Sequence, residues 1–311
     1  MPEADLAAAR AGDETAFGRL MAPYRAELEA HCYRMVGSVH DAEDLVQETL
    51  IRAWRGLAGF DGRALRPWLY RIATNRCLTL LASRRRRELP TEVGEEAEPL
   101  WLEPYPDARL DPEPAAVARE TLELAFVAAL QRLPARPRAA LLLCDVLRFP
   151  AREAAAVLNT SVASVTSALQ RARRTLEGTE RTDPPHDPAT RALADRYAAA
   201  WEAGDADAIV SLLAEDARYS MPPLPEWYAG RPAIRAFLAE PMRYRWQFRP
   251  VRANGQVAYG TYRLVGGEWT AGGLDVLAVR HGRVAEVVAF LDPGLFPRFG
   301  LPMSFPAGAG S

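Results

Sequence analysis

The spacing of apolar residues divides the chain into helical stretches and a strand-rich tail. Between residues 5 and 87, apolar side chains recur at three- and four-residue steps with few breaks, which is the period of helices packed on a core. The stretch DAEDLVQETLIRAW, residues 41–54, predicts one such helix. One face of this helix is apolar, and the other carries four polar side chains: Asp41, Asp44, Gln47 and Glu48.

A second helical block, residues 119–178, contains a break typical of a helix-turn-helix. Its last part, FPAREAAAVLNTSVASVTSALQRARRTL, is interrupted at Asn159–Ser161 between a short helix and a longer one. Ser161 is a natural N-cap for the longer helix. The predicted buried stripe of that helix is Val162, Val165, Leu169, Ala172 and Leu176. Its other face has small polar residues early and arginines late, which suits a helix that enters the major groove; an ordinary surface helix is the alternative.

From residue 191 the pattern changes. A helix with one aromatic face comes first, and Gly204-Asp205 ends it and caps the next one. In RYRWQFR every second residue is aromatic, which is the two-residue period of a strand. Asn254-Gly255 and His281-Gly282 lie between strand-like runs, as hairpin turns do. Three helices followed by a curled antiparallel sheet predict an α+β domain with a concave face.

Two polar stretches with several prolines separate these blocks. Residues 88–118 are rich in Pro and Glu, and residues 181–190, RTDPPHDPAT, carry three prolines, so both are predicted to be linkers. Trp101, Leu102 and Tyr105 are unexpected in a pure spacer. We therefore expect these three side chains to pack onto a groove of a partner.

Composition narrows the class of protein. A length of 311 residues predicts two or three domains, and the net charge of -2 conceals an acidic stretch, residues 88–123, with 11 Asp and Glu against two Arg. No apolar run approaches the roughly 20 residues that cross a bilayer, and the acidic N-terminus predicts no signal peptide. Cys32, Cys77 and Cys144 lack metal-ligand spacing. We therefore expect the three thiols to be reduced and buried and the protein to be cytoplasmic. No metal or cofactor is expected.

Several of these motifs together resemble one family. DAEDLVQETLIRAW, FDGRALRPWLYRIATNRCLTLLASRRRR and the helix-turn-helix, in this order, resemble the two domains of an extracytoplasmic-function (ECF, group 4) RNA polymerase sigma factor of the sigma-70 superfamily. The tail resembles the SnoaL-like cone fold. The resemblance implies a multidomain protein, with two all-α domains followed by an α+β domain. Its segments are sigma region 2 at 1–87, a linker at 88–118, region 4 at 119–180, a linker at 181–190 and the SnoaL-like domain at 191–311.

The resemblance implies that the acidic helix face binds RNA polymerase. In such sigma factors the matching helix docks on the clamp helices of the β′ subunit, and the β flap is the other expected contact on the polymerase core. Asp44, Gln47 and Glu48 are the residues that match. Their chemistry agrees, because an acidic face repels phosphate and suits a basic protein surface. A merely solvated charged face is the alternative.

The segment after this helix is expected to open and hold promoter DNA. By resemblance it holds the flipped-out base of the minus-ten element, whose extrusion costs a few kcal/mol. The residues that match are Arg63, Arg66, Arg71, Thr74, Asn75 and Arg76. Trp68 is either a stacking wedge or, as its helical spacing favours, a core residue. Arg84–Arg87 are expected to contact phosphates, with a solubilised helix end as the alternative.

On the longer helix of the helix-turn-helix, the resemblance implies contacts with the minus-thirty-five element. The matching residues are Thr166, Ser167, Gln170, Arg171 and Arg173. Gln can pair with adenine and Arg with guanine, whereas Arg173 suits a phosphate. The expected partners are therefore core RNA polymerase and promoter DNA, and no membrane.

The cone of the tail offers a candidate pocket. Asp275 lies on an apolar strand, and its predicted neighbours are Tyr219, Trp227, Tyr259, Tyr262 and Trp269. A SnoaL-type cyclase or isomerase needs an acid-base group with a partner that stabilises an enolate. No Asp–His or Asp–Tyr pair stands at matched positions, so catalysis is not expected. A domain that modulates the sigma factor, with or without a small apolar ligand, is preferred over this enzyme and over a stand-alone helix-turn-helix repressor.

Overall fold

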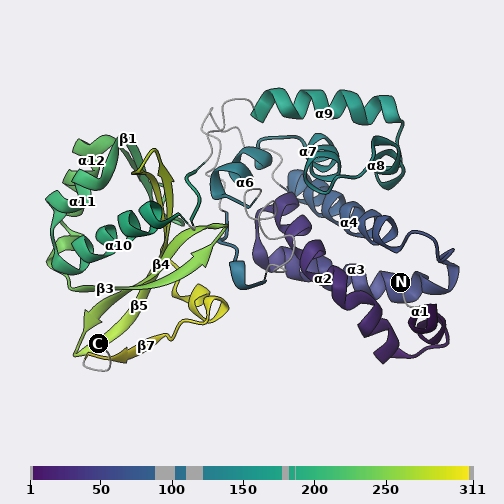
Figure 1. Cartoon of the computed structure of the whole chain (residues 1–311), viewed down its shortest axis with the longest axis horizontal. Helices are drawn as coiled ribbons and strands as arrows, with labels where there is room; N and C mark the ends of the chain where they lie inside the picture. The colour runs from purple at the N-terminus through teal and green to yellow at the C-terminus, as the bar shows by residue number, and fades with distance from the viewer. Residues whose placement is uncertain (1–2, 88–101, 110–121, 177–181, 186, 308–311) are drawn as a thin grey trace. The chain divides into compact units, whose positions relative to one another are not determined.

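The computed structural model of the chain describes residues 3–87, 102–109, 122–176, 182–185 and 187–307. They form two compact units (Figure 1). The helical unit lies within residues 1–103 and 109–179, and the C-terminal unit lies within residues 104–108 and 180–311. Residues 104–108 thus belong to the C-terminal unit, although helices of the helical unit follow them in the chain.

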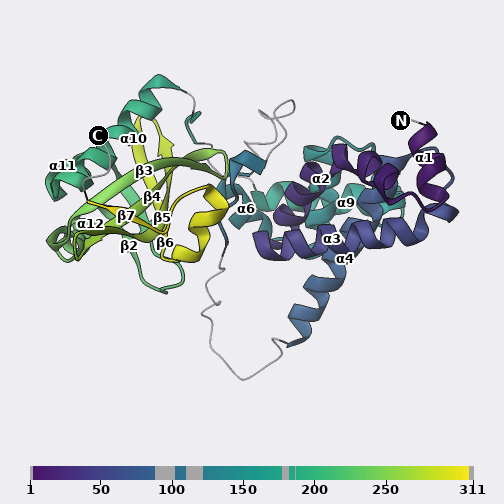
Figure 2. The ribbon, with the colours of Figure 1, turned by 90° about the horizontal axis from the view of Figure 1, so that it is seen from below.

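The helical unit contains two sets of helices, one formed by α1 to α4 and the other by α6 to α9. In the described part of the chain they are α1 (Glu3–Arg10), α2 (Glu14–Val36), α3 (Val39–Gly56), η1 (Leu57–Gly59), α4 (Leu65–Arg87), α6 (Leu124–Gln131), α7 (Ala135–Leu141), the π-helical turn η3 (Leu142–Val146), α8 (Ala151–Val157) and α9 (Val162–Leu176). Helices α2, α3 and α4 pack side by side (Figures 1 and 2). Leu28, Tyr33, Leu45, Leu69 and Tyr70 are among the buried side chains that hold them together.

Local sequence signals start and end these helices. Asp13 and Ser38 cap α2 and α3, because each side chain accepts a hydrogen bond from a backbone N–H in the first turn. Gly37 ends α2 with a φ of 77°, the left-handed conformation that glycine adopts most easily. A single glycine and a single serine therefore separate two long helices and set their turn.

The predicted helix-turn-helix is present as α8, a turn and α9. Asn159 adopts a left-handed φ of 48° in the turn, and Ser161 accepts a hydrogen bond from Ser164 N as the predicted N-cap. Val162 was expected in the buried stripe of α9, but it is 46% exposed. It is the first residue of the helix, and the buried contacts begin one turn later, at Val165.

The C-terminal unit combines helices with one sheet. Its described elements are η2 (Asp107–Arg109, whose last residue lies in the helical unit), α10 (Pro188–Ala203), α11 (Ala206–Leu212), β1 (Leu213–Ser220), β2 (Trp227–Ala229), α12 (Gly230–Leu238), η4 (Pro241–Arg243), β3 (Trp246–Ala253), β4 (Gln256–Val265), β5 (Glu268–Arg280), β6 (Arg283–Phe290), η5 (Pro293–Phe299) and β7 (Ser304–Pro306). Asn254-Gly255 and His281-Gly282 make the predicted hairpin turns, with positive φ at all four residues.

The described strands run in the order β2-β1-β6-β5-β4-β3, and β7 pairs with β5. The expectation of a purely antiparallel sheet is wrong, because β1 pairs with β6 in parallel. These two strands are far apart in the chain, so no hairpin forces them to be antiparallel. Helices α10, α11 and α12 gather on one side of the sheet (Figure 2), where their apolar side chains form the main core.

A bulge in β5 shapes the concave face. Thr261 of β4 pairs with Gly273, and the next residue, Tyr262, pairs with Ala271, so Gly272 is an extra residue in β5. Such a bulge bends its strand, and glycine tolerates the close approach that results. A Cβ atom at Gly273 would lie 2.7 Å from the carbonyl oxygen of Phe290.

Candidate polymerase and promoter interfaces and a C-terminal cavity

The acidic face of α3 is accessible. The Asp44 and Gln47 side chains are exposed, and within the described residues the Asp44 carboxylate has one distant ion-pair contact, 3.9 Å to His40. Glu48 is half-buried. The three predicted polymerase contacts therefore share one helix surface, and two of them are available to a partner protein.

Glu48 links this surface to α4. Its carboxylate lies 3.1 Å from Arg52 on its own helix and 2.8 Å from Arg76 on α4. Partial burial opposes ionisation, but hydrogen bonds from both guanidinium groups lower the pKa of Glu48. Glu48 is therefore held as an anion, and it orients an arginine that was predicted to bind DNA.

The predicted minus-ten residues do not all share one environment. Arg63, Arg71 and Asn75 are exposed, Arg66 and Arg76 are half-buried, and Thr74 is fully buried. Thr74 Oγ1 lies 3.0 Å from Nε2 of His31, which is also buried. Burial lowers the pKa of His31 to about 3, so this pair is neutral. Thr74 is part of the packing between α2 and α4 and does not face solvent.

Trp68 lies beside the start of α4. Its ring stacks on Phe60 with the centroids 4.8 Å apart, and it is half-buried. It lines a small depression of about 340 Å³ together with Arg71 of α4 and Glu153 of α8. The first helix of the helix-turn-helix thus lies next to the residues predicted to hold the minus-ten element.

An aromatic contact joins the two sets of helices in the helical unit. The ring of Phe149, just before α8, meets Tyr70 of α4 edge-on at 5.3 Å. The Arg66 guanidinium lies over both rings, 5.0 Å from Tyr70 and 4.8 Å from Phe149, a cation–π arrangement. Arg66 also donates to Glu27 at 3.1 Å. A residue predicted to bind DNA is therefore already held by protein groups.

Arg138 of α7 forms the second contact between these sets of helices. Its guanidinium is buried and donates to the backbone carbonyls of Met35, Gln131 and Leu133. Gln131 in turn donates to the carbonyl of Arg34 at 3.0 Å. Burial lowers the pKa of Arg138 to about 10, so it remains charged at neutral pH. The carbonyls of Arg34 and Met35, at the end of α2, therefore accept hydrogen bonds from Gln131 and Arg138.

The α9 helix presents all five predicted minus-thirty-five residues to solvent. Thr166, Ser167, Gln170 and Arg171 are exposed along one side. Arg173 makes a bidentate pair with Asp145, with contacts of 2.9 and 2.7 Å. Four of these residues are therefore available to base edges or phosphates, and the fifth is anchored to η3.

Residues 102–109 are divided between the two units. In the helical unit, the Glu103 carboxylate accepts hydrogen bonds from Ser38 Oγ at 2.9 Å and from the first two backbone N–H groups of α3. Negative charge is favourable at a helix N-terminus. Arg109 pairs with one carboxylate of α2 and one of α3. The predicted linker thus binds the helix that carries the acidic face.

The middle of the same segment, residues 104–108, packs in the C-terminal unit. Tyr105 is fully buried. Its backbone N–H donates to Asn254 Oδ1 at 2.7 Å, and its carbonyl accepts from Asn254 N at 2.8 Å. Asp107 Oδ1 accepts a hydrogen bond from Gly255 N at 2.8 Å. The segment is therefore bound to the tip of the β3–β4 hairpin by backbone and side-chain hydrogen bonds together.

The apolar linker residues were expected to pack onto a groove of a partner, but two of the three pack within this chain. Tyr105 is buried, and Leu102 is half-buried against Gly37; Trp101 lies outside the described residues. The roles of Glu103 and Arg109 were missed, because charged residues in a Pro-rich stretch are usually solvated.

The concave face of the C-terminal sheet encloses a cavity of about 690 Å³. Tyr219 and Asp275, both predicted, line it. The other predicted residues lie elsewhere: Trp227 is 62% exposed, Tyr259 donates to Asp195, and Tyr262 and Trp269 pack with η5 and β7. The lining that sequence reasoning missed is Trp201, Tyr228, Phe237, Trp246 and Phe248.

Asp275 is the buried acid of this cavity. It is 4% exposed, and among the described residues no hydrogen bond or ion pair reaches its side chain. Burial raises the pKa of Asp275 to about 7. Its charge in turn contributes, after burial, to raising the pKa of Tyr219 and Tyr197. Tyr219 of β1 was predicted beside Asp275, whereas Tyr197 of α10 was not, and the charge of Asp275 acts on both.

This pKa makes a prediction about stability. The ordinary pKa of an Asp carboxyl is about 3.9, so Asp275 contributes fully to stability below about pH 4, and that contribution is lost as the pH rises to about 7. The asparagine side chain of Asp275→Asn has no proton to lose. The free energy of unfolding of this variant, relative to that of the unaltered protein, should therefore rise by up to about 4 kcal/mol as the pH increases over this range. Calorimetric unfolding of both proteins at about pH 4.5 and about pH 8 measures the difference. An equal response of both to pH contradicts it.

In the part of the chain that the structure describes, no helix combines the length and the apolar character that a bilayer crossing requires.

Comparison with known proteins identifies the parts of the chain. Residues 20–87 match the family model "Sigma-70 region 2", residues 123–176 match "Sigma-70, region 4", and residues 194–287 match "SnoaL-like domain". The ECF RNA polymerase sigma factor SigG of Mycobacterium tuberculosis is 47% identical over 306 residues, which cover 91% of this chain and 83% of SigG.

Two further relatives show how much of the chain is shared. The ECF RNA polymerase sigma factor SigW of Bacillus subtilis is 35% identical over 170 residues, which cover 53% of this chain and 89% of SigW. The crystal structure of the Mycobacterium tuberculosis sigma factor SigJ superposes with a TM-score of 0.63 at 28% identity and covers 90% of this chain and 98% of that one. With both sigma-70 regions in order, a SnoaL-like domain behind them and 47% identity to SigG, this chain belongs to the extracytoplasmic-function family of RNA polymerase sigma factors.

Proposed function

We propose that this sigma factor binds core RNA polymerase through Asp44, Gln47 and Glu48 of α3, and that its C-terminal unit restrains initiation by holding residues 104–108. The observation that carries the restraint is the docking of this segment on the Asn254-Gly255 turn. The match to SigW covers 53% of this chain and 89% of SigW, and the two sigma-70 regions of this chain lie within residues 20–176. The helical unit therefore corresponds to a whole sigma factor, to which the C-terminal unit adds a further control.

The α3 surface is suited to a basic protein partner. Its outermost groups are the carboxylate of Asp44 and the amide of Gln47, both exposed. The arginines proposed to bind promoter DNA lie on α4, on the loop just before it and on α9, not on this face of α3. Opposite charges on separate surfaces allow one molecule to contact polymerase and DNA at once.

Chain length explains how docking can restrain initiation. The minus-ten and minus-thirty-five elements lie about 25 base pairs apart, roughly 85 Å along the DNA axis. When residues 102–109 are bound, thirteen residue steps join Arg109 to Leu122, which span at most about 45 Å. When that segment is released, the linker from Arg87 to Leu122 spans up to about 120 Å. Release therefore allows the two sigma regions to separate and reach both elements.

We expect Asn254→Gly to raise promoter-specific transcription by about three- to tenfold at limiting sigma factor. Glycine keeps the left-handed turn but removes the acceptor for Tyr105 N, and a lost hydrogen bond of this kind changes a local equilibrium by about 0.5–1.5 kcal/mol. Run-off transcription with purified core polymerase, on a promoter selected from genomic DNA, measures the change. Tyr105→Ala, which removes the buried ring, should act in the same direction and more strongly.

His281→Gly is the matched control. His281 has a φ of 52° in the other hairpin turn and is exposed, so this variant also places glycine at the left-handed first position of a hairpin turn, but away from residues 104–108. It should leave transcription unaltered. Lower transcription from both Asn254→Gly and Tyr105→Ala, with the melting temperature unchanged, would show that the C-terminal unit assists initiation and would overturn the restraint.

A further inference from the structure

The cavity of the C-terminal unit has the dimensions of a ligand site. Its volume of about 690 Å³ lies within the range of roughly 300–1,000 Å³ that small-molecule pockets occupy. Aromatic side chains from three directions wall it: Phe237 of α12, Tyr228 of β2, and Trp246 and Phe248 of β3. Tyr228 and Phe237 are stacked at 4.6 Å with an interplanar angle of 25°. Flat, apolar walls of this kind suit a planar ring system.

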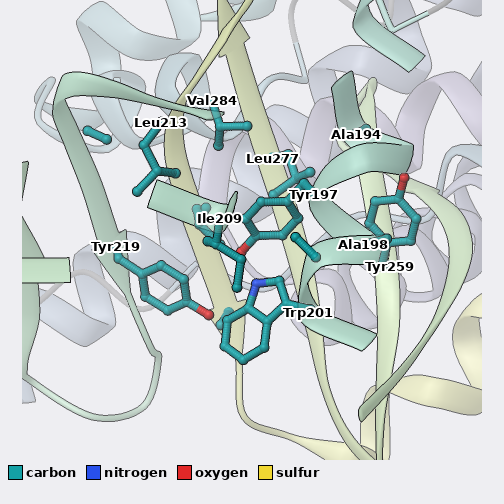
Figure 3. Close-up of a cluster of buried hydrophobic side chains, with 14 of the residues drawn as sticks. Ala194, Tyr197, Ala198, Trp201, Ile209, Leu213, Tyr219, Tyr259, Leu277 and Val284 are labelled. Carbon is teal, nitrogen blue, oxygen red and sulfur yellow. The ribbon is translucent and has the colours of Figure 1, made fainter. Parts of the chain in front are cut away.

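Polar groups lie in the cavity wall and in the core next to it: Trp201, Tyr219 and Asp275 line the cavity, whereas Tyr197 is a core residue. The hydroxyls of Tyr197 and Tyr219 point toward the indole of Trp201 (Figure 3). The buried Tyr197 hydroxyl and Trp201 Nε1 have no partner that meets hydrogen-bond geometry. Asp275 adds a carboxyl group that lines the same cavity and is likewise unpaired within the described chain. An acceptor atom on a ligand can satisfy the donors that line the cavity, which are the Trp201 indole N–H, the Tyr219 hydroxyl and the protonated Asp275 carboxyl.

The charges of the lining argue against an ionised ligand. Besides Asp275, the charged side chains among the described lining residues are Glu240 and Arg263, both exposed. Their formal charges cancel, and neither is buried with Asp275. An anion would meet the Asp275 carboxyl, and a cation would require that carboxyl to be ionised in an apolar interior, which is costly.

We infer that this cavity binds an uncharged, planar molecule whose carbonyl oxygen accepts hydrogen bonds from the Asp275 carboxyl and the Tyr219 hydroxyl. Asp275 then acts as a neutral acid that donates its proton to a hydrogen bond, and no covalent step is involved. The regulatory meaning of this site rests on the proposed function, because a ligand that fills the C-terminal unit can alter how that unit holds residues 104–108.

The titratable groups around Asp275 come from several elements. They are Tyr197 of α10, Tyr219 of β1 and Tyr259 of β4, with Glu240 and Arg263 at the mouth of the cavity. Burial raises the pKa of all three tyrosines, so they stay neutral up to at least about pH 9. Only Asp275 therefore changes its charge between about pH 6 and about pH 8.5 among these acids, and the affinity for a carbonyl ligand should fall as its carboxyl loses the proton.

Binding can be measured on the full chain without polymerase. Prodan, a fluorescent naphthalene ketone whose emission shifts to the blue in apolar surroundings, serves as the probe. We expect a saturable blue shift at about pH 6 and an affinity at least about tenfold lower at about pH 8.5, where the carboxyl has lost its proton. Acetylnaphthalene should displace prodan at least about tenfold better than ethylnaphthalene at the lower pH. These two competitors have almost the same shape, and only the first carries a carbonyl oxygen.

Two substitutions locate the effect. Asp275→Asn keeps a donor that cannot titrate, so prodan binding should persist with its pH dependence removed. Asp275→Leu removes the donor, so at about pH 6 its affinity for prodan should be as low as the affinity of the unaltered protein for ethylnaphthalene. Equal displacement by the two competitors on the unaltered protein would overturn carbonyl recognition even if a variant failed to fold, and the absence of any blue shift would overturn the site. Neither result bears on the Asn254→Gly experiment, which tests the restraint by itself.

Discussion

Replacing Glu48 by lysine should weaken binding to core RNA polymerase by at least about thirtyfold. Reversing the charge places a cation against the basic surface that the acidic face of α3 is proposed to contact, and like charges across an interface cost several kcal/mol. A thirtyfold loss corresponds to about 2 kcal/mol. The fold should persist, because the ion pairs of Glu48 with Arg52 and Arg76 are partly solvated and ion pairs at a protein surface contribute about 1 kcal/mol or less. The dissociation constant for core polymerase and the melting temperature measure the two effects.

Glu215→Lys is the charge-matched control. Glu215 is exposed on β1 of the C-terminal unit, so its replacement alters the net charge equally without touching α3. Glu48→Gln should give an intermediate affinity, since it removes an anion without adding a cation. If Glu48→Lys and Glu215→Lys bind core polymerase equally well, α3 is not the docking surface.

Replacing Arg171 by alanine should lower transcription from the preferred promoter by about five- to a hundredfold. Arg171 is exposed on α9 next to Gln170, where a guanidinium can form two hydrogen bonds with guanine. Loss of one such contact costs about 1–3 kcal/mol. Discrimination at a single base pair of the minus-thirty-five element should relax at the same time. Run-off transcription on a set of single-base promoter variants measures both quantities.

Arg174→Ala separates base reading from general attraction to DNA. Arg174 is exposed on the same helix but is not among the residues that match the family positions. Its loss should weaken all promoter variants alike. If Arg171→Ala also weakens all variants by one common factor, Arg171 contacts phosphate and does not read a base.

Local signals in the sequence predicted the elements of this fold. Asn254-Gly255 and Ser161 each determine their own backbone conformation through steric freedom or a short-range hydrogen bond. The parallel pairing of β1 with β6 escaped prediction, because it depends on how distant strands are placed in the sheet and not on any residue in either strand.

The candidate sites were predicted unevenly for the same reason. Exposed residues such as Asp44 and Gln170 were correctly placed on polar helix faces, since helical periodicity decides which face a residue occupies. Thr74 was misplaced because its partner, His31, comes from another helix. Helical periodicity placed Trp201 on the aromatic face of its helix, but the cavity beside it depends on how that helix and the strands are arranged in space.

Several arginines proposed to meet DNA are already neutralised by protein carboxylates, and this alters how promoter binding responds to ionic strength. The pairs are Arg66 with Glu27, Arg76 with Glu48, Arg84 with Asp41 and Arg173 with Asp145. A guanidinium that keeps its carboxylate displaces fewer of the cations condensed on the DNA backbone. The binding constant then falls less steeply with salt than the number of arginines suggests. Under the proposed contacts, these ion pairs would act as internal counterions and make promoter binding less sensitive to the salt content of the cell.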